Sequence, residues 1–236
     1  MILIHRAPGK INRDLIDIFK DIVIPPICTV CGKISSELLC SQCASEIEEI
    51  KSKICKYCGR PLPAADPDNN RCSYCRDKNF SFYRHRSFAV YKGKIKKIIG
   101  KYKYSRIYAL KEIIAAFLEK TYIRNYKSEK IDYIDTVPGW HTESLCRVLS
   151  KSIKIPFAGN MMTVREILKQ QGLDSIQRKS NIKEAFKVKD CLLTRRKNLM
   201  LVDDVWTTGS TLNEIAGILK RAGADRIYLL TFARGI

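Results

Sequence analysis

Residues 199–211 read LMLVDDVWTTGST, and this stretch decides the fold expected for the chain. Leu199 to Val202 form a short apolar run typical of a strand buried on both faces of a parallel sheet, and Asp203-Asp204 is predicted to end it. The helix predicted next spans Leu212 to Ala222 and has an apolar face at helical spacing. A strand, a loop and a helix in this order predict an α/β domain with a ligand loop at the carboxyl edge of its sheet.

The loop between this strand and this helix combines four hydroxyl side chains, a glycine and two acids. Free amides at the helix start, joined by those hydroxyls, suit a phosphate monoester. Asp203 and Asp204 would repel such an anion unless they accept hydrogen bonds from vicinal hydroxyls or from water around a magnesium ion. A ribose 5-phosphate satisfies both halves. A solvated strand end followed by a helix cap is the alternative, and the loop is not a Walker P-loop, because Gly-x-x-x-x-Gly-Lys is absent.

Eight of the ten cysteines form four Cys-x-x-Cys pairs. The pairs are Cys28/Cys31, Cys40/Cys43, Cys55/Cys58 and Cys72/Cys75. Two such pairs supply the four thiolates of a closed, tetrahedral zinc site, so we expect two structural zinc ions. Reduced thiols and redox-active pairs are the alternatives, but the pairs lie among turn residues rather than at a strand-to-helix junction. Sequential and interleaved pairing fit the spacing equally.

The remaining features give the expected domain organisation. Residues 1–25 are predicted to contain an amphipathic helix, because apolar residues recur at helical spacing from Ile11 to Ile22. Residues 26–79 form the cysteine-rich module, and residues 80–236 are long enough to bury a core of their own. Cys146 and Cys191 lie outside the pairs and are expected to be buried.

Composition limits where the chain acts and what it binds. No run approaches the roughly 18 apolar residues of a membrane span, and the first ten residues lack the apolar core of a signal peptide, so we expect a cytoplasmic protein. In that reducing compartment, paired cysteines are more often metal ligands than disulfides. Lys and Arg number 43 against 24 Asp and Glu, a formal charge of +19 that favours anionic substrates or polyanions.

Much of this positive charge lies between Lys92 and Lys130, where tyrosines are interspersed with lysines and arginines. A second basic excess runs from Arg178 to Lys197. Bases can stack on tyrosine while lysines neutralise single-strand phosphates, so single-stranded DNA is one candidate ligand. The alternative is a pair of solvated helix faces whose tyrosines pack inward.

These motifs carry a family resemblance. Val202 to Thr211 resembles the phosphoribosyl-pyrophosphate (PRPP) signature of type I phosphoribosyltransferases, and the chain as a whole resembles the ComF family of competence-associated proteins. The family opens its zinc module with Pro-x-Cys-x-x-Cys, here Pro26 to Cys31. The other matching stretches are Gln171-Gly172-Leu173, Arg178 to Asn181, Ala185-Phe186, Gly223-Ala224 and Ile227 to Phe232.

The resemblance implies a PRPP site used with Mg²⁺. The residues implied to bind PRPP are Asp203, Asp204, Thr207, Thr208, Gly209, Ser210 and Thr211. A pyrophosphate loop is implied at Val137, Pro138 and Gly139, but the family's following basic stretch is replaced here by Trp140-His141-Thr142-Glu143-Ser144. His141 is a possible donor beside that loop, although a lone histidine is more often an ordinary surface residue. Lys101, Lys103 and Arg106 are further candidates for contact with a phosphate.

The expected fold is a type I phosphoribosyltransferase-like α/β domain with a mostly parallel sheet and flanking helices, preceded by a small zinc-ribbon module. The predicted strands are Arg86 to Tyr91, Ile131 to Val137, Leu199 to Val202 and Arg226 to Phe232. One functional hypothesis is a Mg²⁺-dependent phosphoribosyltransferase of unknown acceptor, linked to DNA uptake. The other is a non-catalytic module that binds single-stranded DNA or a partner such as a DNA-uptake helicase or another competence protein, which the altered stretch after Pro138 favours.

Overall fold

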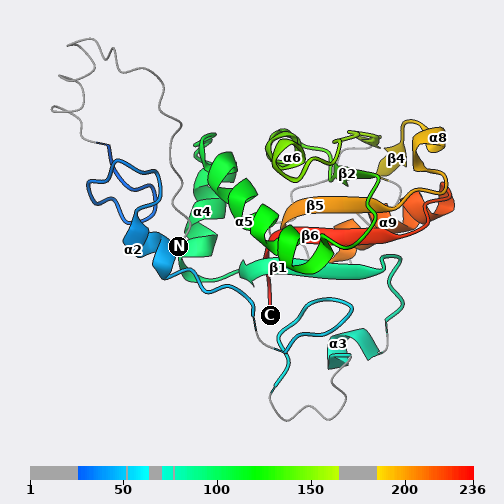
Figure 1. The fold of residues 1–236 in the computed structure, drawn as a ribbon, viewed down its shortest axis with the longest axis horizontal. Coiled ribbons are helices and arrows are strands. Elements are labelled where there is room, and N and C mark those ends of the chain that lie inside the picture. The colour runs from blue at the N-terminus through cyan, green and yellow to red at the C-terminus, as the bar shows by residue number, and fades with distance from the viewer. Residues whose placement is uncertain (1–25, 52, 64–70, 77, 165–184) are drawn as a thin grey trace. The chain divides into compact units, whose positions relative to one another are not determined.

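The computed structural model describes residues 26–51, 53–63, 71–76, 78–164 and 185–236, and Figure 1 shows the chain as a ribbon. It divides into two compact units, with the boundary between Ser45 and Glu46. The helix predicted within residues 1–25 lies outside the described residues. The domain boundaries at residues 26, 79 and 80 therefore stay predictions, and each unit is described by itself.

The described part of the first unit is small and built around its cysteines. An antiparallel bridge joins Ile27 to Ile34, and helix α2 spans Ser41–Ser45. Gly32 follows the second cysteine of the first pair with φ at 75°, a left-handed conformation that glycine adopts without strain. Few apolar side chains are available here to build a core, so the cysteines are the main organising groups.

The second unit is an α/β sandwich around one parallel sheet. Its strands are β1 (Arg84–Val90), β2 (Tyr133–Thr136), β5 (Leu199–Trp206) and β6 (Ile227–Arg234). They lie in the order β1-β6-β5-β2, and all three neighbouring pairs are parallel. The antiparallel pair β3 (Met161–Thr163) and β4 (Phe186–Val188) forms a separate small sheet. The helices are α3 (Ser73–Arg76), α4 (Gly93–Lys103), α5 (Leu110–Tyr126), α6 (Trp140–Ile153), α8 (Cys191–Thr194) and α9 (Ser210–Arg221).

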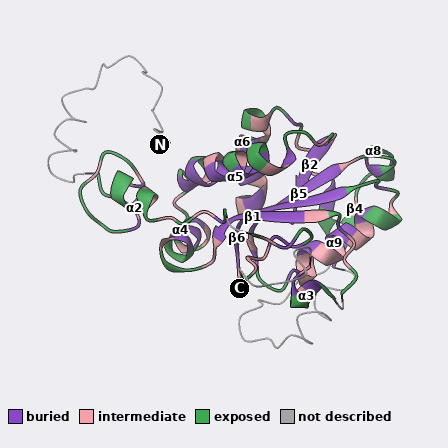
Figure 2. Ribbon diagram, turned by 60° about the horizontal axis from the view of Figure 1, so that its bottom comes forward, coloured by how far each residue is buried: buried purple, intermediate pink, exposed green. Residues whose placement is uncertain are grey.

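Helices cover both faces of this sheet, which is why most residues of its strands are buried (Figure 2). On one face, α5 packs against β1 and β6, and the ring of Phe117 lies 4.5 Å from that of Phe88. On the other face, α9 contributes Leu212 and Ile215 to a core that also contains Leu201. The predicted fold class, a mostly parallel sheet with flanking helices behind a cysteine-rich module, is thus confirmed.

The predicted strand after Leu199 was too short. Strand β5 runs on to Trp206, so Asp203 and Asp204 lie inside it instead of ending it. The reason is its neighbour: β6 continues to pair with β5 as far as Trp206↔Arg234, whereas β2 pairs with it only as far as Val202. The two acids therefore lie in a strand segment that pairs with β6 on one side and is not paired with β2 on the other.

Two smaller expectations had opposite outcomes. Cys146 is fully buried in α6, as predicted, whereas Cys191 at the start of α8 is exposed, so its predicted burial was wrong. The short helix that carries Cys191 also leaves Leu192 exposed, because it packs only Thr194 inward. In the described part of the chain, no helix has both the length and the apolar character needed to cross a bilayer.

Candidate functional site

The candidate ligand site lies beyond the end of β2, beside the last residues of β5. Strand β5 contains Asp204, which is buried, and Asp203, which is half-buried. Residues 207–210 connect this strand to α9. The Asp204 amide donates a hydrogen bond of 2.8 Å to Asp203 Oδ1, which orients that carboxylate. Thr208 and Ser210 hydroxyls lie 2.9 Å apart at the start of the helix. Residues 207–211 are named the phosphate loop below.

A second loop, Val137 to Gly139, follows β2 and reaches the same edge of the sheet. Thr136 Oγ1 donates a bond of 2.7 Å to the Val202 carbonyl, which ties the end of β2 to β5. Thr142 Oγ1, one turn into α6, donates to the carbonyls of Val137 and Gly139 at 2.7 and 3.0 Å. The two loops are therefore adjacent, as parallel neighbours in a sheet require.

A cavity of about 280 Å³ joins the two loops. It is lined by Lys103, Val137, Pro138, His141, Thr142, Phe186 and every residue from Asp203 to Leu212. All seven residues predicted to bind a phosphoribosyl ligand thus line one cavity, together with two of the three residues of the predicted pyrophosphate loop. Gly139 does not line it, because it lies at the N-cap of α6.

Lys103, which ends α4, is the principal cation of this cavity. Its Nζ lies 2.6 Å from Asp204 Oδ2, and the Asp204 side chain is 2% exposed. Burial disfavours the ammonium ion, but Asp204 and Asp203 outweigh burial and raise the pKa of Lys103. Of the three basic candidates proposed from the sequence, only Lys103 lines the cavity. We attribute this to α4, whose last turn points Lys103 at the end of β5.

His141 also faces Asp204, with its Nε2 3.6 Å from Asp204 Oδ2. Of the two interpretations of His141, its place in the lining of the cavity favours a possible donor over an ordinary surface residue. The Tyr102 hydroxyl donates to the His141 carbonyl at 2.6 Å and so ties the start of α6 to α4. Burial, aided by Lys103, lowers the pKa of His141 despite the opposing charge of Asp204. The imidazole is therefore neutral at pH 7 and can donate or accept one hydrogen bond.

Asp203 and Asp204 are adjacent acids, and Lys103 is, among the described residues, the one lysine that lines the cavity beside them. Burial first, and then the neighbouring charge of Asp204, raise the pKa of Asp203 to about 8, while Lys103 opposes the shift. Hydroxyl donors or a hydrated cation that reached Asp203 would favour its ionised form and so lower this pKa. Carboxylate oxygens are also ligands that Mg²⁺ prefers, so Asp203 and Asp204 fit a magnesium-assisted site.

Gly209 shapes the phosphate loop. Its φ is 73°, and a Cβ placed on it would lie 2.1 Å from the ring of Trp206. Trp206 is 1% exposed and packs edge-on against Phe82 at 5.5 Å. Residue 206 is the variable position of the PRPP signature, so its role under the loop could not be read from the motif. Only glycine combines this backbone angle with this close approach.

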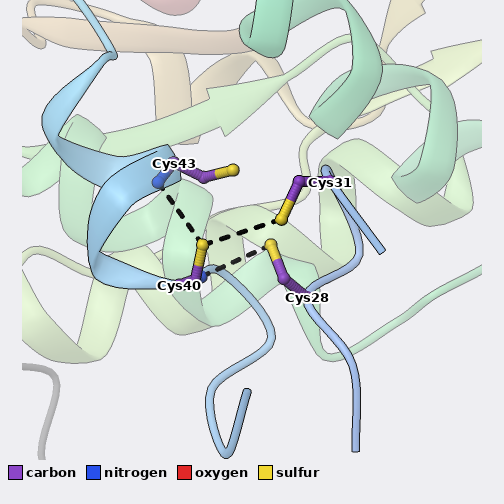
Figure 3. Close-up of side chains that lie close together, drawn as sticks. All are labelled: Cys28, Cys31, Cys40 and Cys43. Carbon is purple, nitrogen blue, oxygen red and sulfur yellow. Dashed lines mark hydrogen bonds between the residues drawn. The ribbon is translucent and has the colours of Figure 1, made fainter. Parts of the chain in front are cut away.

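The first cysteine cluster contains Cys28, Cys31, Cys40 and Cys43, whose sulfurs converge in Figure 3. Cys31 Sγ and Cys40 Sγ lie 3.8 Å apart. Four sulfurs about 2.3 Å from a central zinc ion are about 3.8 Å from one another in a tetrahedron, so the spacing fits this metal. The amides of Cys40 and Cys43 donate to Cys28 Sγ and Cys40 Sγ at 3.4 Å, which favours the thiolate form.

The second cluster contains Cys55, Cys58, Cys72 and Cys75, all buried. The Sγ atoms of Cys58 and Cys72 lie 3.6 Å apart, again close to a tetrahedral edge. Both clusters therefore combine consecutive pairs, which decides the pairing order that the spacing left open. Two buried cations, Arg86 and Arg234, lie beside this cluster, and within the described residues neither forms an ion pair with a carboxylate. A zinc ion with four thiolates carries a net charge of −2 and would balance them.

The basic, tyrosine-rich segment is partly neutralised within the second unit. Lys92, Lys94, Lys103, Lys120 and Arg124 all form ion pairs with acids of the same unit. Some of its tyrosines pack inward, and others are exposed and available for stacking on bases. Tyr102, Tyr122 and Tyr126 pack inward, but Tyr104 and Tyr108 are 73% and 52% exposed. The Tyr108 ring lies edge-on to the exposed Trp140 at 5.1 Å.

The sequence did not predict two residues that contact the candidate site. Phe186 lines the cavity from β4, and Tyr74 donates a hydrogen bond of 2.6 Å to the carbonyl of Thr208 in the phosphate loop. Phe186 belongs to a motif that the resemblance did supply, without a role. Tyr74 had a signal that was overlooked, because Cys55-Lys56-Tyr57-Cys58 and Cys72-Ser73-Tyr74-Cys75 share a tyrosine at the same place. The segments 171–173 and 178–181 lie outside the described residues.

Comparison with protein families and curated proteins finds a family match for the cysteine-rich module and weaker similarity over most of the chain. Residues 19–78 match the double zinc ribbon domain family. The chain is 28% identical over 230 residues to the DNA utilization protein YhgH of Salmonella typhimurium, covering 90% of this chain and 99% of the relative. It is 28% identical over 213 residues to competence protein F of Haemophilus influenzae (83% and 90%) and 24% identical over 201 residues to competence protein ComFC of Streptococcus pneumoniae (83% and 87%).

Solved structures show weaker similarity. An adenine phosphoribosyltransferase from Trypanosoma brucei matches with a TM-score of 0.38 and 16% identity over 66% of this chain and 73% of its own. A glutamine PRPP amidotransferase from Bacillus subtilis matches with a TM-score of 0.38 and 16% identity over 51% of this chain and 25% of its own. Both scores lie below 0.5, so the ligand has to be inferred from this chain's own loop and cavity.

Proposed function

We propose that the second unit of this chain, which is similar to competence protein F and competence protein ComFC, binds PRPP together with Mg²⁺ and acts in the handling of DNA taken up by the cell. The observation that carries the proposal is the cavity of about 280 Å³ shared by Asp203, Asp204, the phosphate loop and the loop after β2. A ligand with an anionic group at each end of a hydroxylated ring matches this distribution of donors and acids.

Each part of the ligand has a counterpart in the cavity. The 5-phosphate accepts hydrogen bonds from the hydroxyls and amides of the phosphate loop. The ribose hydroxyls donate to Asp203 and Asp204, and the pyrophosphate, neutralised by Mg²⁺, lies toward Pro138. Lys103 then contacts the ligand's negative charge from the α4 side, because it already reaches into the cavity beside Asp204.

The loop after β2 argues against rapid turnover. Departure of pyrophosphate develops negative charge, which a catalyst stabilises with positively charged groups or oriented donors. Here the Gly139 amide is directed instead at Glu143 Oε1, at 3.4 Å, and the neutral residues Trp140 and His141 replace the family's basic stretch. The site therefore favours binding of PRPP over transfer of its phosphoribosyl group.

A second candidate function is contact with single-stranded DNA, and one observation favours it. Trp140, 41% exposed, and Tyr108 form an exposed aromatic pair at the start of α6, immediately beyond the cavity residue Pro138. Exposed rings beside lysines are the usual platform for stacked bases. This would place a DNA contact next to the PRPP site and would explain why aromatic residues replace arginines there.

Calorimetric titration with PRPP and Mg²⁺, run beside an assay of pyrophosphate release with a panel of bases, tests the proposal. We expect saturable binding without release. Release with one of the bases would make the protein a transferase, and absence of binding would remove PRPP as the ligand.

Replacing both Asp203 and Asp204 by Asn should abolish PRPP binding and leave retention of single-stranded DNA unchanged. The double variant Asp132→Asn with Asp225→Asn, which changes two acids outside the cavity, is the matched control and should bind PRPP as the parent does. Unchanged PRPP affinity in the Asp203/Asp204 variant would contradict the site assignment.

A further inference from the structure

The second cysteine cluster is in direct contact with the phosphate loop, although the two are far apart in sequence. Tyr74, between Cys72 and Cys75 on α3, donates its hydroxyl to the Thr208 carbonyl at 2.6 Å. We propose that the metal-bound second cluster positions the phosphate loop, with Tyr74 and Trp206 as the positioning residues, so that ligand affinity depends on the metal of this cluster. The proposal rests on the proposed function only in taking this loop as the phosphate site.

The hydrogen bond from Tyr74 fixes the orientation of one peptide group in the loop. The peptide between Thr208 and Gly209 is planar and trans, so its carbonyl and its N–H point in opposite directions. When the Thr208 carbonyl is held toward Tyr74, the Gly209 N–H is turned away from α3. Gly209 lines the cavity. Without this anchor, the peptide could rotate about the neighbouring ψ and φ angles, which glycine permits freely.

A second connection runs through aromatic rings. The imidazole of His85 stacks on Trp206 with ring centroids 4.3 Å apart, and its Nδ1 lies 3.0 Å from the Cys58 carbonyl. Trp206 in turn lies directly beneath Gly209, where a Cβ would meet its ring. Arg234 also donates to the Cys58 carbonyl, and the Gly235 amide donates to the Trp206 carbonyl at 2.8 Å. The Cys55/Cys58 turn is therefore connected, through His85 and Trp206, to Gly209 in the phosphate loop.

This turn approaches the sheet closely because of Gly59. Its φ is 66°, and a Cβ on it would lie 2.8 Å from the His85 carbonyl. The Arg86 guanidinium donates to the Lys56 carbonyl at 3.0 Å, so a second residue of β1 contacts the turn. His85, Arg86 and Arg234 all contact backbone carbonyls of this turn. A bound metal would fix the conformation of that backbone.

Among the described residues, the segment around the cluster has a small core. It consists of the four cysteines with Leu62, Tyr74 and Phe80 as partly buried apolar neighbours. A segment with so small a core depends on its metal for folding, as structural zinc sites generally do. Loss of the metal should therefore free both Tyr74 and the Cys58 carbonyl, and with them the two supports of the loop.

The chain offers a matched pair of variants. Tyr74→Phe removes the hydroxyl and keeps the ring against Phe80, whose centroid is 6.1 Å away. Tyr57→Phe makes the same change at the corresponding position of the Cys55/Cys58 turn, outside the cavity. Neither change should alter the zinc content measured by elemental analysis. We expect Tyr74→Phe alone to weaken PRPP binding about fivefold, as loss of one neutral hydrogen bond would.

Hydrogen–deuterium exchange of the unliganded protein gives a readout that needs no ligand. Amides of residues 208–211 should exchange faster in Tyr74→Phe than in the parent or in Tyr57→Phe. Cys75→Ser, which breaks the second cluster, should increase exchange there further, whereas Cys40→Ser in the first cluster should not. If Cys75→Ser fails to fold, the comparison of Tyr74→Phe with Tyr57→Phe still tests the positioning role of Tyr74.

The two proposals fail in different ways. If the parent protein does not bind PRPP, the proposed function is wrong, and faster exchange in Tyr74→Phe would still support the positioning role. If the parent binds PRPP and Tyr74→Phe leaves both affinity and exchange unchanged, the positioning role is overturned and the proposed function stands. If the parent does not bind PRPP and Tyr74→Phe exchanges like the parent, both proposals are overturned.

Discussion

Lys103 and Asp204 form an ion pair of 2.6 Å at the floor of the cavity, between the last residue of α4 and a strand residue 101 positions later in the chain. The pair is partly shielded, because the lysine side chain is 26% exposed and the aspartate 2%. It neutralises one of two adjacent acids and leaves Asp203 as the carboxyl that a ligand or cation would engage.

Lys103→Met should therefore destabilise the protein. The change leaves the buried carboxylate of Asp204 without its cation, at a cost of roughly 1–3 kcal/mol. Thermal or urea unfolding measures the loss, and Lys101→Met, on an exposed position of the same helix, is the control and should be close to neutral. If the two variants unfold alike, the ion pair contributes nothing measurable to stability. Adding Asp204→Asn to Lys103→Met should recover most of the loss.

The pKa of Asp203 predicts a pH dependence of stability. Its pKa is raised from the ordinary value of 3.8 to about 8 by burial and by Asp204, so the folded state retains a proton that the unfolded chain has already released. The favourable contribution is complete below about pH 4 and is lost as the pH rises toward 8.

Asp203→Asn keeps a neutral side chain at every pH. The variant should gain stability relative to the parent between pH 4 and pH 8, with a difference in Tm of roughly 2–4 °C for each kcal/mol. Thermal unfolding at a series of pH values measures this difference. A Tm difference that stays constant over the whole range would contradict the raised pKa.

Gly209→Ala should disturb both stability and ligand binding. The added methyl group would force an alanine into a left-handed conformation and against the ring of Trp206, at a cost of roughly 1–3 kcal/mol. Gly217→Ala, within α9, is the matched control, because its Cβ would come no nearer than 3.4 Å to side-chain atoms of Arg221 and Ser81. That change should be neutral or stabilising by up to about 1 kcal/mol. Equal unfolding midpoints for the two variants would argue against a shaped phosphate loop.

The two cysteine clusters predict close to two zinc ions per chain. Elemental analysis of the purified protein measures the content, and Cys31→Ser combined with Cys40→Ser should reduce it to about one. Substituting Cys146 and Cys191, which lie outside the clusters, should leave it unchanged. A folded preparation free of metal would exclude the structural role of both sites.

Charge reversal on α4 tests DNA contact. Lys96, Lys97 and Lys101 form no ion pair with any described acid, and reversing them to Glu should lower affinity for single-stranded DNA and flatten its salt dependence. Reversal of three paired lysines, Lys92, Lys94 and Lys120, makes the same change in net charge and is the control. Their partners are Glu48, Glu46 and Glu49. An unchanged salt slope in the α4 variant would exclude this face from binding.

Replacing Trp140 by Ala should lower DNA affinity without changing the salt slope, because stacking does not displace counterions. Fluorescence anisotropy of a labelled oligonucleotide at several salt concentrations separates the two effects.

Local patterns in the sequence determined much of this protein. The cysteine spacing predicted two metal sites, and the apolar run before Asp203 predicted a buried parallel strand. Hydroxyls and a glycine before α9 predicted an anion loop, and that loop does line a cavity. Each of these signals lies within a few residues of chain, where spacing and residue type are sufficient to specify the local geometry.

Only the tertiary structure decided how those parts meet. The length of β5 depends on β6, the burial of Asp204 depends on Lys103 from α4, and the support of Thr208 depends on Tyr74, 134 residues away. The sheet order β1-β6-β5-β2 brings these segments together, and no local pattern encodes that order. Contacts between distant segments are selected by the packing of the whole core, and this is why the sequence by itself could name the loop but not what holds it in place.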